Sequence, residues 1–239
     1  MRKLTLLVAI LSFLTAQSVI AQGWGSGIDG EGDVIKQEIS LPALKGFDLG
    51  FGGDVIVTPG ATQKIVIEGQ KNIIDNIKRD VSNGTWRISY MKSVDNAKSV
   101  TVYITIPTIE YVGLSGSGSV KSTGKFSGLK DIDIAVSGSG DITLDIDAKD
   151  TGIRISGSGE IDLSGTTQSL EVAISGSGDV MTKDLVASSC KIQISGSGDA
   201  AVYVNGELET HISGSGDVRY RGNASVTAKI SGSGEVTKL

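Results

Sequence analysis

The pattern that decides the fold is clearest in the stretch Ile153-Arg154-Ile155-Ser156-Gly157-Ser158-Gly159-Glu160-Ile161-Asp162-Leu163. Its central Ser-Gly-Ser-Gly occurs seven times in the 239-residue chain, and we call each copy a corner. The copies begin at Ser115, Ser137, Ser156, Ser175, Ser195, Ser213 and Ser231. They are 22, 19, 19, 20, 18 and 18 residues apart, a period typical of coiled repeat proteins. The spacing predicts an all-β chain wound as a flattened, single-stranded parallel β-helix, or β-solenoid, with 18–22 residues per coil.

Strict alternation runs through each copy and predicts which side chains face the interior. Ile153, Ile155, Gly157 and the apolar residues after the corner share one parity, while Arg154 and the serines share the other. Extended backbone places alternate residues on opposite faces, so the glycines should point inward. We attribute them to a narrow edge where the two walls converge and leave no room for a side chain. The serines should face water.

An acidic residue directly follows six of the seven corners. These six are Asp141, Glu160, Asp179, Asp199, Asp217 and Glu235, and Ser119 stands in the remaining copy. Stacked coils should align them as a surface acidic ladder, which is tolerable in water because each neighbouring repulsion is below about 1 kcal/mol. Calcium is the alternative. However, calcium-binding repeats use a nine-residue period with a different glycine-to-aspartate spacing. We therefore favour a solvated or hydrogen-bonding ladder, and the sequence predicts no catalytic residue, cofactor or metal site.

Other polar residues were weighed as candidate sites. An outward row precedes the corners and is neutral or basic, so it could pair with neighbouring acids. The row consists of Gly113, Ala135, Arg154, Ala173, Gln193, His211 and Lys229. His211 is the only histidine and is predicted to be a surface side chain, whereas Cys190 has inward parity and no base to activate it. Asp145, Asp147 and Asp150 form the densest acidic group and are interpreted as a polar loop.

The N-terminal sequence predicts export. A short basic start at Arg2 and Lys3 precedes an apolar run, and small residues at Val19 and Ala21 suit a signal peptidase. We expect a signal peptide over 1–21, a flexible segment over 22–32, irregular N-terminal coils or a cap over 33–114, and regular repeat coils over 115–239, the last two forming one domain. The apolar run is too short to span a bilayer, which needs about 20 residues. The protein is therefore expected not to span the membrane.

Before the first corner the chain still reads as strands. These are expected at 34–41, 47–57, 64–68, 85–90 and 100–106. The only helical candidate is Asn72–Arg79, where three isoleucines fall on one face. Gly52-Gly53-Asp54-Val55 is a candidate degenerate copy of the corner.

Composition and charge narrow the classes of function. Removing Arg2 and Lys3 leaves 20 basic residues against 27 acidic ones, a net charge of −7, which disfavours nucleic acid as a partner. Aromatic residues make up 5% of the chain, with no stripe suited to sugar stacking, so an enzyme acting on polysaccharide is the weaker alternative. An ice-binding surface is a third class, and it lacks the repeated threonine pairs of such proteins. A single cysteine allows no intramolecular disulfide.

Several segments together resemble a known family. They are Phe47-Asp48, Gly53-Asp54-Val55-Ile56-Val57, Asn72-Ile73-Ile74-Asp75, Asn83-Gly84-Thr85-Trp86-Arg87-Ile88 and the Ser-Gly-Ser-Gly-Asp copies. Over roughly Asp33 to Leu239 the chain is similar to the "putative autotransporter adhesin head (GIN) domain" family of Bacteroidetes. The resemblance implies a right-handed β-solenoid related in shape to pectin lyases but without their catalytic residues, and a role in cell adhesion.

The sequence therefore predicts a noncatalytic, exported adhesin-like or envelope structural module that mediates cell adhesion or partner contact through a repetitive surface. The alternative is a polysaccharide-binding or polysaccharide-degrading β-helix protein. Its location would be the periplasm, the cell surface or the medium. Partner hypotheses are a host or envelope protein, a glycan, or a second copy of the chain, because the last coil exposes an open edge.

Overall fold

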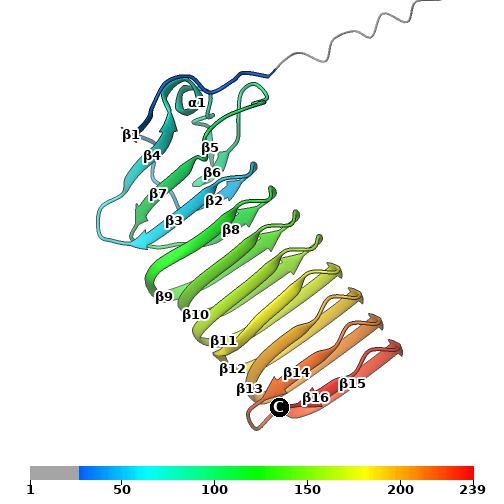
Figure 1. The fold of residues 1–239 in the computed structure, drawn as a ribbon. Coiled ribbons are helices and arrows are strands. Elements are labelled where there is room, and N and C mark those ends of the chain that lie inside the picture. Colours follow the sequence, from blue (N-terminus) through cyan, green and yellow to red (C-terminus); the bar gives the residue numbers. More distant parts are fainter. Residues whose placement is uncertain (1–26) are drawn as a thin grey trace, which may run out of the picture.

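The computed structural model describes residues 27–239, which form a stack of β-coils beneath an irregular N-terminal region (Figure 1). The signal peptide expected over 1–21, and residues 22–26 of the segment after it, lie outside this described part. We call residues 27–114 the N-terminal region and residues 115–239 the regular stack. The strands of the regular stack are β9 (Ser119–Val136), β10 (Asp141–Ile155), β11 (Glu160–Gly176), β12 (Asp179–Gly196), β13 (Ala200–Gly214), β14 (Val218–Arg221), β15 (Ser225–Gly232) and β16 (Val236–Lys238).

Successive coils of the regular stack pair in parallel, with register shifts confined to a few positions. β10 pairs with β11 from Asp141↔Glu160 to Ile155↔Ile174 without a break in register, and β12 and β13 continue the ladder. Parallel pairing between consecutive turns of one chain is the arrangement that the repeat period predicts. The predicted all-β solenoid is confirmed, with about seven turns.

Each long strand supplies both walls of the flattened coil. Figure 1 shows the strands turning back at the edge opposite the corners, so that one strand leaves a corner along one wall and returns along the other. Bulges at this bend absorb differences in coil length. Between β9 and β10 the register shifts between Thr143 and Asp145 and again between Ile146 and Ala148. The longest spacing between corners, 22 residues, falls at this coil.

Alternation along the strands places the apolar residues inside, as predicted. Ile153, Ile155, Ile161 and Leu163 are each at most 2% exposed, whereas Arg154 is exposed. Burying an aliphatic side chain of this size contributes about 1.5–3 kcal/mol relative to exposure. Columns of Ile, Val and Leu thus hold the stack together, and both serines of all seven corners are exposed.

The corner glycines are required by the coil above rather than by convergence of the two walls. A Cβ on Gly157 would overlap the carbonyl oxygen of Gly138, and one on Gly159 would overlap that of Gly140. The Cβ on Gly159 would also lie 2.7 Å from Val136 Cγ1. All three of these atoms belong to the preceding coil. The second glycine is buried in five corners and the first glycine in none, so the inward expectation holds for the second glycine only. The steric cause is close backbone stacking along the axis.

The N-terminal region starts the parallel stack and adds antiparallel strands to it. Its strands are β1 (Val34–Ile39), β2 (Gly46–Leu49), β3 (Asp54–Pro59), β4 (Lys64–Gln70), β5 (Val81–Ser82), β6 (Thr85–Ile88), β7 (Thr101–Ile106) and β8 (Tyr111–Leu114). One wall continues upward through β9, β8, β2 and β6, and the other through β9, β3 and β7, all in parallel. β4 and β1 then extend the second wall in antiparallel fashion. Coils and a covering sheet therefore meet in this region.

The helix is shorter than the sequence suggested. Helix α1 spans Lys71–Asp75, whereas the apolar pattern predicted Asn72–Arg79. The chain leaves the helix at Asn76, whose side-chain amide donates to Lys92 O (2.8 Å) and whose Oδ1 accepts from Lys92 N (3.0 Å). This contact with a distant loop replaces further helical hydrogen bonds. Within residues 27–239, no helix has the length and apolar character needed to cross a membrane.

Candidate functional site

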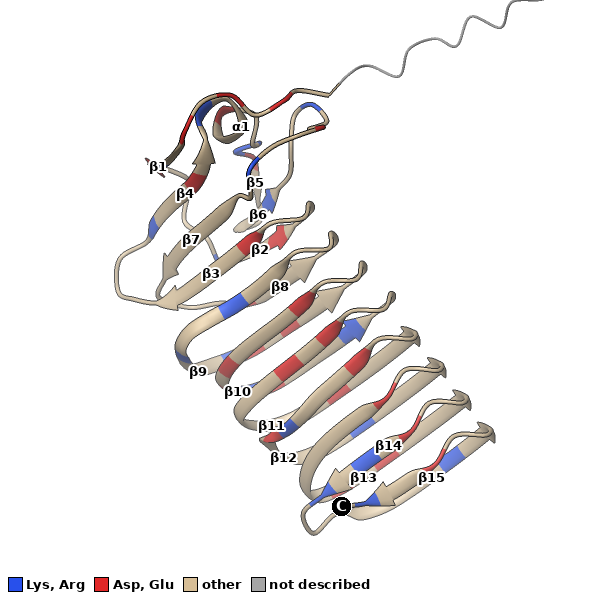
Figure 2. Cartoon of the chain, in the orientation of Figure 1, with Lys and Arg blue, Asp and Glu red and all other residues tan. Residues whose placement is uncertain are grey.

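The predicted acidic residues stand one above another on the wall that leaves the corners. Asp141 pairs with Glu160 and Glu160 with Asp179, and red bands recur at this point from coil to coil in Figure 2. The column extends one coil further than predicted, because Asp54 pairs with Ser119 and accepts a hydrogen bond from its Oγ at 2.6 Å. The sequence indicates this extra position, because Asp54 directly follows the degenerate corner that ends at Gly53.

The lower carboxylates of this ladder form hydrogen bonds between coils. Asp179 Oδ1 accepts from Asp199 N (2.9 Å), Asp199 Oδ1 from Asp217 N (2.8 Å) and Asp217 Oδ1 from Glu235 N (2.9 Å). Hydrogen bonds to an ionised acceptor are stronger than neutral ones. In the coils above, Asp141 N donates to Gly118 O (3.2 Å) instead. The lower acids therefore replace a backbone acceptor.

The two bonding patterns accompany two backbone conformations at the same corner position. Gly176 and the equivalent glycines in the three later corners have φ between +138° and +147°, a region that side-chain-bearing residues avoid. The equivalent residues above, such as Gly157, do not have positive φ. The surrounding Ser-Gly-Ser-Gly sequence is identical, so the corner sequence alone does not determine the change in φ.

Glu160 sits at the transition between these patterns. Burial raises the pKa of its carboxyl group, and the neighbouring Asp141, Asp162 and Asp179 raise it further. Lower in the ladder, Arg219 relieves repulsion by pairing with Asp199 at 3.4 Å. Residues 27–239 contain no group of three or more His, Cys, Asp or Glu side chains arranged to hold a metal ion.

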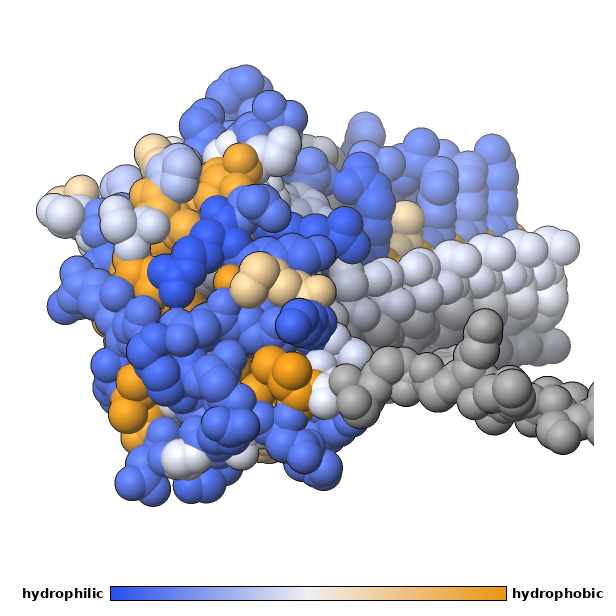
Figure 3. All heavy atoms as spheres, turned by 90° about the horizontal axis from the view of Figure 1, so that it is seen from above, coloured by the Kyte–Doolittle hydropathy of each residue, from blue (hydrophilic) through white to orange (hydrophobic). Residues whose placement is uncertain are grey.

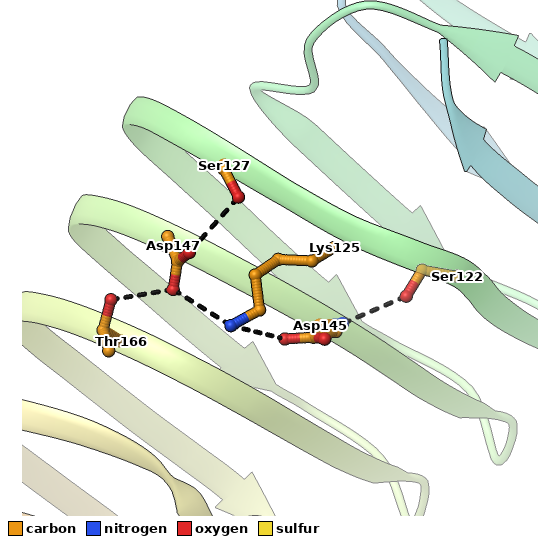
Figure 4. A network of polar contacts seen from close by, with 6 residues as sticks. All are labelled: Ser122, Lys125, Ser127, Asp145, Asp147 and Thr166. Carbon is orange, nitrogen blue, oxygen red and sulfur yellow. Dashed lines mark hydrogen bonds and ion pairs between the residues drawn. The ribbon is translucent and has the colours of Figure 1, made fainter.

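A second polar network joins three coils at the bend (Figure 4). Lys125 Nζ lies 3.5 Å from Asp145 Oδ1 and 3.4 Å from Asp147 Oδ1, so one ammonium bridges two carboxylates of the next coil. Ser127 donates to Asp147 Oδ2 (3.2 Å) and Thr166 donates to Asp147 Oδ1 (2.8 Å). The Thr166 hydrogen bond, with smaller contributions from Lys125 and Ser127, lowers the pKa of Asp147 despite opposing partial burial.

This network separates the three acids that are close in sequence. Asp150 lies beyond the bend, where it pairs with Asp131 and Ser169 in the ladder and lies 3.7 Å from Lys149 Nζ. Asp145 and Asp147 share the single positive charge of Lys125 and tie the coils together. All three residues lie within strand β10, so the interpretation as a polar loop is wrong, and their carboxylates do not converge on one site.

A groove runs along the wall that enters the corners, opposite the acidic ladder and beside the corner edge. We call it the corner groove. It has a volume of about 860 Å³ and is lined by the first serine of every corner, from Ser115 to Ser231. The residues two positions before these serines form much of the remaining lining, including the small Ala135 and Ala173. At about 4.8 Å per coil, the groove is roughly 29 Å long. The alternation of the sequence predicts this outward row, whereas nothing in the sequence indicates the groove.

Charged and aromatic side chains lie at defined points of the corner groove. Arg154, His211 and Lys229 line it, and no Asp or Glu of residues 27–239 does so. Arg154 Nη1 pairs with Asp133 Oδ1 at 2.9 Å, and His211 Nε2 lies 3.2 Å from Glu209 Oε1, both acids standing outside the groove. These pairs match the expectation that the outward row has acidic neighbours.

Tyr111 closes the N-terminal end of the corner groove. A Cβ on Gly113 would meet the Tyr111 hydroxyl at 2.7 Å, so the ring lies along its own strand, β8, over a residue without a side chain. Burial raises the pKa of Tyr111, and the negative charges of Asp48 and Asp133 add to this effect. The phenol is therefore neutral at physiological pH, with an apolar ring beside a row of hydroxyls.

The single cysteine is buried, as its parity predicted. Cys190 is 4% exposed, and burial raises the pKa of its thiol to about 12. The thiolate is the reactive form of cysteine, so this side chain is inert at neutral pH. It acts as a small apolar residue of the core.

Comparison with known proteins identifies relatives by sequence and by fold. The family described as "Putative auto-transporter adhesin, head GIN domain" matches residues 45–224. No curated protein matches the chain.

Solved structures share the fold over nearly the whole chain. A "putative adhesin" from Bacteroides fragilis is 22% identical with a TM-score of 0.84, covering 89% of this chain and all of its own. A "putative adhesin" from Parabacteroides merdae is 18% identical with a TM-score of 0.75, covering 90% of this chain and all of its own. A "putative lipid binding protein" from Parabacteroides distasonis is 24% identical with a TM-score of 0.69, covering 89% of this chain and 99% of its own.

Proposed function

This chain belongs to the auto-transporter adhesin head GIN domain family, and we propose that it is an exported, noncatalytic adhesin-like module of the cell envelope. It acts in the periplasm, at the cell surface or in the medium by presenting a long, regular surface to a partner. Many weak contacts repeated along one face add up to firm attachment. The family match and the adhesin names of neighbours from Bacteroidetes support this role.

The observation that carries the proposal is the register of the outward side chains. On the wall that enters the corners, strands β10 to β13 pair so that outward side chains always face outward side chains of the next coil. Equivalent outward positions therefore recur from coil to coil. Both serines of each corner are exposed over all seven coils. Such a surface presents the same chemistry many times, which suits contact with an extended or repetitive partner.

A noncatalytic role agrees with how the acidic residues are used. Asp179, Asp199 and Asp217 accept backbone N–H groups, and Asp145 and Asp147 are bridged by Lys125. Polysaccharide cleavage needs a carboxylate pair available to act as acid and as base or nucleophile. These five carboxylates instead stabilise contacts between coils.

The experiment is a glycan-array screen combined with a bead-adhesion assay and a degradation assay. Beads coated with the purified protein should adhere to cells or to an immobilised glycan. The same protein should release no reducing ends from common polysaccharides during prolonged incubation. Absence of adhesion would contradict the adhesin role, and chain cleavage would establish the enzymatic alternative.

A polysaccharide-binding role is the second candidate, favoured by the corner groove. The groove crosses seven coils and is lined by hydroxyl groups, aliphatic surface and one tyrosine. Sugars present hydroxyls at their edges and C–H groups on their faces, and therefore suit a mixed lining of this kind.

A further inference from the structure

We propose that the corner groove binds an acidic polysaccharide whose chain lies along the solenoid axis; this deepens the proposed adhesin function and rests on it. The inference joins four observations: the shape of the groove, its repeating hydroxyls, its charge and its aromatic end. Each concerns the same continuous surface from Tyr111 to Ser231.

The shape of the groove selects an extended chain. Its volume of about 860 Å³ is spread across seven coils, so it is long and shallow instead of deep. Small residues at Ala135 and Ala173 leave room between the coil backbones and the serine row. A linear polymer running parallel to the axis would contact each coil in turn.

The serine row supplies one hydroxyl per coil on one side of the groove. Ser115 donates to Asp48 Oδ1 at 3.0 Å, and the six equivalent serines below it are exposed to solvent. Hydroxyls repeat at the coil spacing of about 4.8 Å, close to the length that one sugar unit occupies in an extended β-linked chain. Each exposed hydroxyl can donate to one sugar oxygen and accept from another.

The charge of the groove selects an acidic polymer over a neutral one. The whole chain has a net charge of −5, yet Arg154, His211 and Lys229 line the groove, and no carboxylate from the described part of the chain lies in the lining. Arg154 is 63% exposed and its pair with Asp133 is superficial, so it can turn toward a carboxylate or sulfate in the groove. The wall that leaves the corners carries the acidic ladder, which would repel an acidic chain from that wall.

Tyr111 provides a terminal platform. Its ring closes the end of the groove nearest the N-terminal region, and its neutral phenol can stack against the C–H face of a sugar while its hydroxyl forms a hydrogen bond. This gives the groove one anchoring point and otherwise uniform contacts.

The test measures retention of the purified protein by immobilised polygalacturonate, hyaluronate and heparin, with neutral dextran as the control polymer. The wild-type protein should be retained by at least one acidic polymer and not by dextran, and added salt should weaken retention. The double variant Arg154→Gln/Lys229→Gln should bind about fivefold to tenfold more weakly. Its matched control, Lys191→Gln/Arg219→Gln, removes the same charge outside the groove and should bind as the wild type does.

A steric variant separates the groove from general charge attraction. Ala173→Trp fills the groove from an outward position and should abolish retention, whereas Thr143→Trp places the same ring on the other wall and should have no effect. Far-ultraviolet circular dichroism should show that all variants keep the β-fold. Tyr111→Ala should weaken binding but leave the salt dependence of binding nearly unchanged, because the ring acts by stacking and not by charge.

Three outcomes would overturn the proposal. The first is that no acidic polymer retains the wild-type protein. The second is that the groove variants and the control variants lose the same amount of binding. The third is that the groove binds a fluorescent fatty acid and that, among the variants, only Ala173→Trp prevents this binding. The bead-adhesion assay distinguishes these failures from failure of the adhesin role. If Ala173→Trp beads adhere to cells as wild-type beads do, adhesion stands and the groove is not its site.

Discussion

The N-terminal region and the regular stack place different residues at the same corner position. In the regular stack this position is always glycine, and in the first corner it is Phe51, which aligns with Gly116. Gly116 lies directly under the backbone of Phe51, whereas the ring of Phe51 stacks on Tyr90 with ring centroids 4.1 Å apart. Glycine is thus needed only beneath another corner, and the uppermost corner is free to carry a large side chain.

The two regions also differ in how they fill their interiors. The largest fully buried side chains include Trp86 and Phe47, which pair with each other in adjacent strands of the N-terminal region. The regular stack relies mainly on aliphatic columns and close backbone contact, with the buried ring of Phe126 in its first coil. Seen from the N-terminal end, hydrophobic patches remain between hydrophilic side chains (Figure 3), and Val34, Ile35 and Met91 are among the exposed apolar residues. The N-terminal end of the stack is therefore filled by larger and less regular side chains than its middle.

The largest expected effect comes from removing Trp86, the largest buried side chain of the N-terminal region. Trp86→Ala should lower the free energy of unfolding by about 3–5 kcal/mol, because a fully buried ring leaves a large cavity and the Nε1 donor to Lys78 O is lost. Hydrogen exchange should show β2 and β6 losing protection first while β12 and β13 keep theirs. Equal loss throughout would mean that the two regions unfold as one unit.

A smaller loss is expected when a methyl group is forced between corners. Gly178→Ala would overlap Gly159 O and approach Ile155 Cγ2 to 2.7 Å, so we expect a cost of about 1–3 kcal/mol. Gly52→Ala is the matched control, because a Cβ there meets no atom within 4 Å. Urea denaturation followed by circular dichroism provides the measurement. Equal midpoints for both variants would disprove the proposed role of axial backbone contact.

The acidic ladder permits a comparison within the regular stack. Asp179→Ala removes the acceptor for Asp199 N and should cost about 1–2 kcal/mol, since a backbone donor loses its partner. Asp141→Ala removes an acid from an upper coil, whose corner bonds are made by the backbone, and should cost less than about 0.5 kcal/mol. Similar urea midpoint shifts for the two variants would show that the ladder acts uniformly.

The smallest expected effect concerns pH and the network at the bend. The pKa of Asp147 is lower in the folded protein, so the ionised form is favoured by folding. Its contribution is present above the ordinary aspartate pKa and is lost as the pH falls through the lower folded value. Thr166→Val, which removes the largest cause, should therefore lower the urea midpoint at pH 7 and have less effect near pH 2. A loss that does not depend on pH would point to packing alone.

Much of the fold was predictable because its cause repeats. The inward parity of Ile153, Ile155 and Cys190 follows from the period of two in extended backbone, and the coils follow from the spacing of the corners. The helix was predicted too long because contact between Asn76 and Lys92, which are distant from the rest of the pattern, ends it at Asp75. Local patterns cannot reveal such a contact.

The candidate sites were harder to predict for two physical reasons. Gly157 and Gly176 lie in identical Ser-Gly-Ser-Gly segments yet differ in φ, so the conformation depends on stacking between coils. The corner groove arises from the relative sizes of side chains on neighbouring coils, such as Ala173 between Arg154 and Gln193. Sequence identified the outward row and its charges, but its depth is a property of the assembled wall.

The hydrogen bonds between coils point along the solenoid axis, and this has a mechanical consequence. Tension applied along that axis acts on all coil junctions in series, so the weakest junction opens first. Force across the strands must instead shear a whole ladder at once. A coil that detaches frees 18–22 residues, or about 60–75 Å of extended chain. Under axial load the molecule would lengthen in steps of one coil and limit the peak force transmitted through it.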